Sequence, residues 1–187
     1  MSEHRRGEVL TIGHSTHDAA VFVELLGRHG VEALADVRRF PSSRRLPQFN
    51  APVLERMLGE AAIDYAMLGD DLGGRRAAAE GSRNGGWRVA GFRGYADHMS
   101  TPEFRRGLAT LERLAAGRRA AFMCAEGPWW RCHRQLIADA MLVRDWSVAH
   151  VMPDGRLTEH RLTPFAVRDG DRLTYPPQQQ PLLDADG

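Results

Sequence analysis

Apolar residues follow two repeating patterns along this chain: short continuous runs and longer stretches with helical spacing. The continuous runs predict five strands, at residues 8–12, 31–37, 63–68, 119–124 and 146–152. Apolar residues three and four positions apart predict helices at residues 18–29, 51–62, 102–116 and 136–143. Strands that alternate with helices are typical of a parallel sheet covered on both faces. We therefore expect an α/β fold: a mainly parallel sheet in a three-layer, Rossmann-like arrangement, forming a single domain over residues 1–172.

Two segments fit neither pattern. Residues 75–91 are rich in Ala, Gly and Arg, and this composition predicts an exposed, mobile loop. Pro and Gln are frequent after Leu173, which predicts a frayed C-terminal tail over residues 173–187.

The predicted strands show where the polar clusters lie in the fold, because several of these clusters directly follow a strand. His14 and Ser15 follow the first strand, Asp36 and Arg38 lie at the end of the second, and Cys124 ends the fourth. The carboxyl ends of parallel strands meet at one edge of a sheet, and ligands bind there. We expect these clusters, together with Gly73 and Gly74 after the third strand, to surround one pocket.

Reactive and charged side chains are most concentrated in the segment from Cys124 to Arg134. It contains both cysteines of the chain, with Glu126, His133 and Arg134. The start of the following helix favours a thiolate at Cys124, whereas burial favours a neutral thiol, so a nucleophilic and a structural role both remain open. A Glu126 covered by the neighbouring tryptophans would have a raised pKa suited to proton transfer. Cys124, Glu126 and His14 are the candidate catalytic residues.

A further set of residues is predicted to bind the ligand. Most offer a positive charge, a hydrogen bond or a close backbone approach near the same edge of the sheet. They are Ser15, Asp36, Arg38, Ser43, Arg44, Gly73, Gly74, Cys132, His133 and Arg134.

Composition restricts the possible mechanisms. All 25 basic residues are arginine, so Schiff-base chemistry and lysine-based phosphate binding are excluded. Every fixed positive charge is therefore a planar guanidinium group, which can donate two parallel hydrogen bonds to a phosphate or carboxylate. The net charge of +1 gives no indication of a polyanionic partner. We expect a small anionic or nucleotide-like ligand, and the sequence identifies no cofactor.

The setting of the protein follows from what the sequence contains. Two cysteines in a chain of this size indicate a reducing compartment without a disulfide framework. No stretch of 18 apolar residues and no signal-like N-terminal segment is present, so we expect a cytoplasmic protein with no membrane partner.

Two alternatives to a small-ligand enzyme remain. Arginine pairs at 38–39, 44–45 and 75–76 lie in loops with aromatic residues, a mixture found in modules that bind single-stranded nucleic acid. Cys124, Cys132 and His133 could instead form a metal site, although their spacing is not a usual zinc pattern.

The motifs also resemble the domain-of-unknown-function family 488. The match covers roughly residues 9–160. Its segments are Thr11-Ile-Gly-His-Ser15, Asp36-Val-Arg38 with Pro41 and Ser43, Leu72-Gly-Gly74, Tyr95-Ala96, Cys124-Ala-Glu126 and Cys132-His-Arg134, and His150 and Glu159-His160 follow them. The resemblance implies an α/β fold and a shared site that includes Tyr95, but it implies no known reaction.

Overall fold

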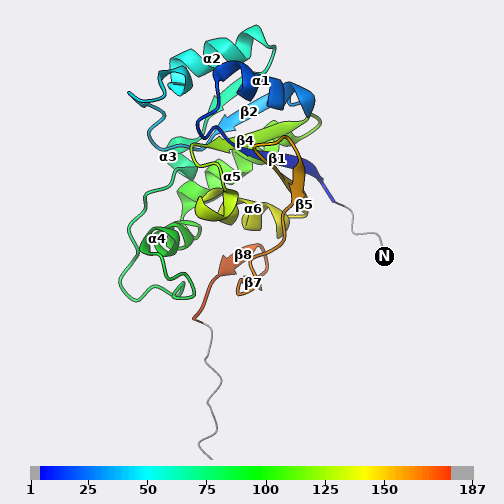
Figure 1. Ribbon diagram of the computed structural model, residues 1–187. Coiled ribbons are helices and arrows are strands. Elements are labelled where there is room, and N and C mark those ends of the chain that lie inside the picture. Colours follow the sequence, from blue (N-terminus) through cyan, green and yellow to red (C-terminus); the bar gives the residue numbers. More distant parts are fainter. Residues whose placement is uncertain (1–4, 178–187) are drawn as a thin grey trace, which may run out of the picture.

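A six-stranded sheet lies between two layers of helices in the computed structural model, which describes residues 5–177 (Figure 1). The strand order is β3-β2-β4-β1-β5-β6; β1 to β5 run parallel, and β6 pairs antiparallel with β5. The strands of this sheet are β1 (Gly7–Gly13), β2 (Ala33–Asp36), β3 (Asp64–Met67), β4 (Ala120–Cys124), β5 (Trp146–Val151) and β6 (Leu157–Glu159). The five predicted strands and the α/β fold class are confirmed.

Helices cover both faces of the sheet, as the sequence predicts. They are α1 (Ala19–Arg28), α2 (Ala51–Glu60), α3 (Gly69–Leu72), α4 (Ala90–His98), α5 (Pro102–Ala115) and α6 (Arg134–Leu142), with short 3₁₀ helices η1 (Pro47–Phe49) and η2 (Trp129–Arg131). One core lies between the sheet and α1 and α2, where Phe22 and Leu54 are fully buried. A second core joins the opposite face to α4, α5 and α6. The central strands β1, β2 and β4 therefore have both faces buried, which explains their continuous apolar runs.

The order of the strands brings together segments that are far apart in sequence. Strand β4 lies between β1 and β2, so Gly13 pairs with Cys124 and Asp36 pairs with Met123. These residues are the last of their strands or next to the last. The carboxyl ends of β1, β2 and β4 therefore lie side by side, and the polar residues that follow them share one edge of the sheet.

Helix α4 is absent from the sequence prediction. Gly91 and Gly94 interrupt its apolar pattern and indicate a loop. In the structure a Cβ at Gly94 would collide with the Arg76 carbonyl oxygen, so Gly94 permits close packing of the helix against the preceding loop. That loop is also less exposed than predicted, because Asn84 is buried and its side chain bonds to Asp97 and to the backbone of Tyr175.

The predicted frayed tail is wrong for its first residues. Strands β7 (Val167–Asp169) and β8 (Arg172–Thr174) form a hairpin, Leu173 is buried, and the following Tyr175 is fully buried. The Tyr175 ring adds a large apolar surface to the second core, which outweighs the local effect of the prolines after it. Residues 178–187 of the predicted tail lie outside the described residues. None of the helices that the structure describes is long and apolar enough to cross a membrane.

Candidate functional site

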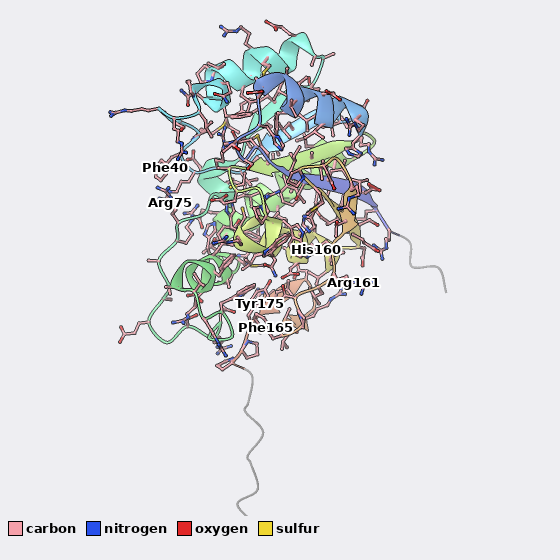
Figure 2. The ribbon with its side chains drawn as sticks, viewed as in Figure 1. Phe40, Arg75, His160, Arg161, Phe165 and Tyr175 are labelled. Carbon is pink, nitrogen blue, oxygen red and sulfur yellow. The ribbon has the colours of Figure 1, made fainter. Side chains whose placement is uncertain are left out.

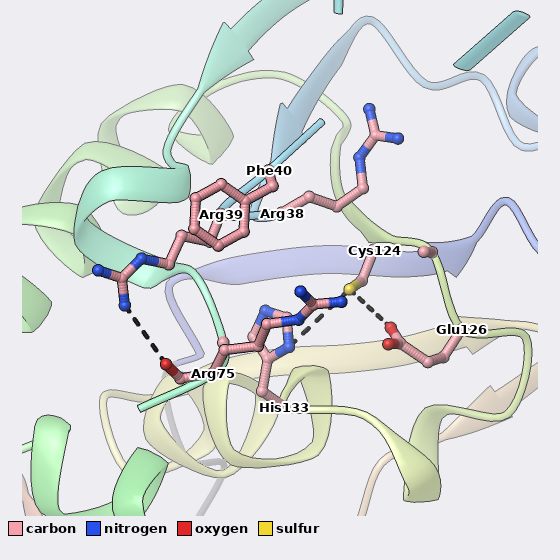
Figure 3. A pocket seen from close by; sticks show the side chains of 9 residues that line it. Arg38, Arg39, Phe40, Arg75, Cys124, Glu126 and His133 are labelled. Carbon is pink, nitrogen blue, oxygen red and sulfur yellow. Dashed lines mark hydrogen bonds between the residues drawn. The ribbon is translucent and has the colours of Figure 1, made fainter. Parts of the chain in front are cut away.

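The polar segments at the carboxyl edge of the sheet surround a cavity of about 160 Å³ (Figure 3). The backbone N–H of His14 donates to the Cys124 carbonyl at 3.0 Å, and the His133 imidazole bonds the Val37 carbonyl at 3.0 Å. These bonds join the segments that follow β1, β2 and β4. The cavity is lined by Arg38, Arg39, Phe40, Gly74, Arg75, Cys124, Ala125, Glu126 and His133.

Cys124 and His133 line the floor of this cavity, and Cys132 lies beside them in the lining of a neighbouring hollow. His133 Nδ1 lies 3.8 Å from Cys124 Sγ and 3.7 Å from Cys132 Sγ. His133 Nε2 donates to the Val37 carbonyl, which leaves Nδ1 directed at the sulfurs. The thiol of Cys124 donates to Glu126 Oε2 at 2.8 Å, and the backbone N–H of Arg134 donates to Cys132 Sγ at 3.5 Å.

The two cysteines have opposite tendencies to ionise. A hydrogen bond with Cys132 and burial raise the pKa of the Cys124 thiol well above its usual value. Burial also opposes ionisation of Cys132, but the hydrogen bond from Cys124 and the positive charge of His133 outweigh it and lower the pKa of Cys132. Burial opposes the charged form of His133, yet the Cys132 thiolate outweighs that effect and raises the His133 pKa. Of the two effects weighed for Cys124 in the sequence, the geometry favours burial, and Cys132 is the sulfur suited to carry the negative charge.

His14 is held in its neutral form beside the cavity. Its Nδ1 donates to the Ser15 carbonyl at 2.9 Å, and its Nε2 accepts from Arg38 at 3.3 Å. Burial, and secondarily the charge of Arg38, lower the pKa of His14 to about 4, while the Ser15 hydrogen bond opposes this shift. The ring also stacks on Phe49, with 4.2 Å between centroids. His14 therefore serves chiefly to hold the Arg38 side chain in this arrangement.

Arg38 lines the cavity, but its guanidinium is already paired. Nη2 and Nε donate to the buried Asp36 carboxylate at 2.5 and 2.9 Å, and the Tyr65 hydroxyl donates to the same carboxylate at 2.7 Å. Figure 3 shows the Arg38 guanidinium directed away from Cys124. The sequence assigns Arg38 to the ligand, whereas the structure uses it to neutralise Asp36, which would otherwise be an unpaired buried charge.

Arg134 also has a different place from the one predicted. It is 1% exposed, it does not line the cavity, and its Nη2 donates to the carbonyls of Glu126 and Gly127 at 2.5 and 2.9 Å. Arg134, which the sequence predicts to bind an anion, instead holds the loop that carries Glu126 in place. The reason is geometric: as the first residue of α6, Arg134 lies under this loop rather than beside the opening.

A chain of buried hydrogen bonds holds Arg134 from the other side. Arg134 Nη1 donates to Thr11 Oγ1 at 3.2 Å, and Thr11 Oγ1 lies 2.8 Å from His150 Nδ1. The chain continues from His150 Nε2 to His160 Nδ1 at 2.9 Å and from His160 Nε2 to Asp139 Oδ1 at 3.0 Å. A guanidinium can only donate and a carboxylate can only accept, so this chain has a donor, Arg134, at one end and an acceptor, Asp139, at the other.

Several contacts bury this chain of hydrogen bonds and hold its side chains in place. Burial, and then the neighbouring His160, lower the pKa of His150 to about 2, so its ring is neutral. Trp129 stacks on His150 with centroids 4.2 Å apart. The Tyr175 hydroxyl donates to the second oxygen of Asp139 at 2.9 Å. Figure 2 shows His160 and Tyr175 apart from Phe40 and Arg75, which mark the opening of the cavity.

The mouth of the cavity carries exposed positive charge. Arg39 donates to the Arg75 carbonyl at 3.3 Å, and the guanidinium groups of Arg39 and Arg75 lie 5.6 and 5.9 Å from the centroid of the exposed Phe40 ring. Arg75 adopts the left-handed backbone conformation (φ 59°), which is uncommon for a residue with a side chain. Figure 3 shows its guanidinium extending toward Cys124. Arg75 is therefore the most available cation of the site.

Gly74 is close to the floor of the cavity. A Cβ at this position would lie 2.9 Å from His133 Nδ1. The sequence predicts that the backbone at Gly73 and Gly74 approaches something closely, and at Gly74 the neighbour is the His133 ring. Gly73 is enclosed against Arg39 instead.

Four other predicted ligand residues lie outside the cavity lining. Ser43 accepts from the Leu46 backbone N–H within its own loop, and Arg44 is exposed on that loop. Ser15 turns the chain with a left-handed backbone (φ 48°), and its hydroxyl lies near Gly127. Tyr95 is buried, and its hydroxyl donates a hydrogen bond to the Leu72 carbonyl at 2.6 Å. It lines a neighbouring hollow of about 240 Å³.

The structure adds residues that the sequence analysis did not assign to the site. Arg39, Phe40 and Arg75 surround the opening, and the arginine pairs in loops were the available signal for them. Thr11 bonds Arg134 directly and belongs to the Thr11-Ile-Gly-His-Ser15 motif, whereas Asp139 and Tyr175 support Arg134 from farther away and no local pattern marks them.

These observations define an α/β protein whose polar groups gather at the carboxyl edge of a mainly parallel sheet. The family model described as Domain of unknown function DUF488 matches residues 18–141, and the chain belongs to this family. No curated protein and no solved structure gives a significant match to the chain.

Proposed function

We propose that this protein is an enzyme that binds a small anionic or nucleotide-like ligand at the carboxyl edge of its sheet. One observation carries the proposal: a single cavity joins the cations Arg39 and Arg75 to a sulfur, a carboxyl group and an imidazole. Guanidinium groups bind phosphate and carboxylate in a fixed orientation. The reactive groups lie where such a ligand would be held.

The cavity is large enough for a ligand group of the size of phosphate. Its volume of about 160 Å³ corresponds to roughly five water molecules. The adjoining hollow of about 240 Å³ shares Gly74, Arg75, Glu126 and His133 with it, and adds Phe92 and Tyr95. An anionic group would occupy the first space, and a larger, flatter part of the ligand would occupy the second.

Glu126 is the candidate for proton transfer in this reaction. It lies at the boundary of the two hollows, and Arg134 holds its backbone carbonyl at 2.5 Å. A carboxyl group fixed at this boundary can accept a proton from, or donate one to, a ligand in either space. Arg75 would supply the positive charge that holds the anion.

Titration calorimetry with inorganic phosphate and with a nucleoside monophosphate tests the proposal. We expect measurable binding by the natural protein and about tenfold or greater weakening in Arg75→Gln, since a hydrogen bond to a charged group contributes about 1.5–3 kcal/mol. Arg113→Gln is the matched control, because Arg113 is exposed in the last turn of α5, at the opposite edge of the sheet. Absence of binding by the natural protein, or equal weakening in both variants, would contradict the proposal.

A nucleic-acid-binding role is the second candidate. A hollow of about 760 Å³ is lined by Trp87, Arg88, Phe92 and Trp130, and Trp130 is half exposed. It shares Val89 and Phe92 with the hollow beside His133, so bases and phosphates of one strand could follow the same path. Binding of a single-stranded oligonucleotide that weakens steeply with salt, without binding of the monophosphate, would favour this candidate.

A further inference from the structure

We infer that Cys124, Cys132 and His133 form a binding site for a divalent zinc-type metal ion. Their ligand atoms, the two Sγ atoms and His133 Nδ1, all lie within 4.8 Å of one another. The three residues come from the end of β4 and the turn before α6, so the fold itself brings them together.

The separations agree with tetrahedral coordination. Zinc lies about 2.3 Å from sulfur and about 2.0 Å from nitrogen, which places neighbouring S and N ligands about 3.5 Å apart and two sulfurs about 3.8 Å apart. The observed distances from His133 Nδ1 are 3.8 Å to Cys124 and 3.7 Å to Cys132. Both distances lie within about 0.3 Å of the tetrahedral value.

The surroundings of the three residues are those of metal ligands. A metal-binding histidine usually donates its other ring N–H to a carbonyl or carboxylate, and His133 Nε2 does so to Val37 at 3.0 Å. Cys132 Sγ accepts the backbone N–H of Arg134, a contact that stabilises a bound thiolate. Gly74 leaves the space in front of His133 Nδ1 free of a side chain.

The donor atoms select the type of metal. Two thiolates and one imidazole suit zinc and similar soft or borderline ions, whereas magnesium and calcium prefer oxygen ligands. Two thiolates would also balance the charge of a divalent ion, so a buried neutral cluster would result.

The site has room for a fourth ligand on the cavity side. Cys124 and His133 line the cavity, and among the described residues Glu126 lies beside the three ligand residues without joining their cluster. Three protein ligands with one open position are typical of zinc sites that activate water. A metal held there would supply a Lewis acid, and Glu126 would be the carboxyl group placed beside it to exchange a proton with the ligand. This role rests on the proposed function, whereas metal binding itself does not.

Cobalt titration of the metal-free protein tests the site. The full chain is treated with a chelator under reducing conditions and titrated with Co²⁺ alone, without any anionic ligand. We expect one equivalent to bind with the intense visible bands of tetrahedral cobalt and a sulfur-to-cobalt band in the near ultraviolet. Cys132→Ser and His133→Gln should each lower the affinity for Co²⁺ by about 100-fold or more. Loss of a residue that only hydrogen-bonds a metal ligand already lowers metal affinity by about 10–100-fold, and these variants remove a ligand itself.

Controls separate metal binding from folding. His29→Gln is the matched histidine control, because His29 lies at the C-terminus of α1, near the opposite edge of the sheet. It should bind Co²⁺ as the natural protein does, and far-ultraviolet circular dichroism should show that all variants are folded. If a ligand variant does not fold, Co²⁺ protection of the natural protein against thiol alkylation at both cysteines, read by mass spectrometry, provides the second test.

Each failure has a distinct outcome. Octahedral or substoichiometric Co²⁺, unchanged binding in Cys132→Ser, or a Cys124–Cys132 disulfide under reducing conditions would overturn the metal site. Phosphate binding that depends on Arg75 would survive that result. Conversely, Co²⁺ binding without any phosphate binding would retain the metal site and reject the proposed function.

Discussion

Gly74 and His133 are in close contact at the floor of the cavity. The space between Gly74 and His133 Nδ1 is too small for even one methyl group. The ring cannot retreat easily, because the Val37 carbonyl holds its other nitrogen and the Tyr95 ring lies 5.0 Å away between centroids. At the scale of the residue, the position of His133 therefore depends on the absence of a side chain at Gly74.

Replacement of Gly74 by alanine is expected to displace His133. The added Cβ would lie 2.9 Å from Nδ1, and excess volume in a packed site costs about 1–3 kcal/mol. Urea denaturation should show this loss in the free energy of unfolding, and Co²⁺ binding should weaken in parallel. Unchanged stability together with unchanged Co²⁺ binding would show that the ring is not constrained by this contact.

At the scale of the element, two glycines at the C-terminal end of α1 differ in what they require. Gly27 is helical, and a Cβ added there would meet no atom of the described residues within 4 Å. Gly30 has a left-handed backbone with φ of 63°. The helix thus ends at a conformation that favours glycine, while Gly27 has no steric reason to be glycine.

Gly27→Ala is expected to stabilise the protein by about 0.5–1 kcal/mol, because alanine has the higher helix propensity and loses less entropy on folding. Gly30→Ala should destabilise it by about 1 kcal/mol, since alanine disfavours the left-handed region. Thermal and urea denaturation of the two variants measure both effects. Equal shifts in the same direction would contradict this interpretation of the helix end.

Glu112 connects three elements at the opposite edge of the sheet from the cavity. It lies on α5 and accepts from Arg144, after α6, at 2.7 and 2.9 Å and from Trp146, at the start of β5, at 3.2 Å. Burial opposes ionisation of Glu112, but the hydrogen bond and charge of Arg144 outweigh it and lower the pKa of Glu112.

This lowered pKa predicts a pH-dependent contribution to stability. The folded pKa lies below the unfolded value, so the contribution is present above the unfolded pKa and is lost as pH falls through the folded pKa. Glu112→Gln should therefore be less stable than the natural protein near pH 7, with a difference that shrinks between about pH 5 and pH 3. Urea denaturation across this range measures the difference, and a gap that stays constant with pH would exclude the effect.

At the scale of the whole molecule, the end of the described chain helps to fix the site from behind. Tyr175 donates to Asp139, and Asp139 ends the hydrogen-bond chain that reaches Arg134. Arg134 in turn holds the carbonyl of Glu126. A residue far downstream of Glu126 in the sequence thus contributes to the position of the cavity loop.

Tyr175→Phe removes the bond to Asp139 and keeps the aromatic ring in the core. We expect a loss of about 1–3 kcal/mol, because one oxygen of a buried carboxylate loses its partner. Tyr65→Phe is the comparison, since its hydroxyl also donates to a buried carboxylate, that of Asp36, at 2.7 Å. If Tyr175→Phe has full stability, the end of the chain does not constrain the core as proposed.

Local pattern was sufficient for most of the fold. The buried strands appear as continuous apolar runs and α1, α2 and α5 as helical spacing, because both signals depend on burial of nearby side chains. The same logic failed at α4 and at Tyr175. Gly94 serves a close contact with the loop at Arg76, and Tyr175 gains its burial from elements far away in the sequence.

For the site, the sequence by itself determined that His14, Asp36, Cys124 and Glu126 gather at the carboxyl edge, because it placed them at the ends of strands in a mainly parallel sheet. Only the tertiary structure decided what each group does. Arg38 and Arg134 became internal partners of Asp36 and of the Glu126 loop, and Arg75 took the exposed position. Charge and hydrogen-bonding capacity are properties of a residue, but the partner that satisfies them is set by three-dimensional distance, which sequence order does not encode.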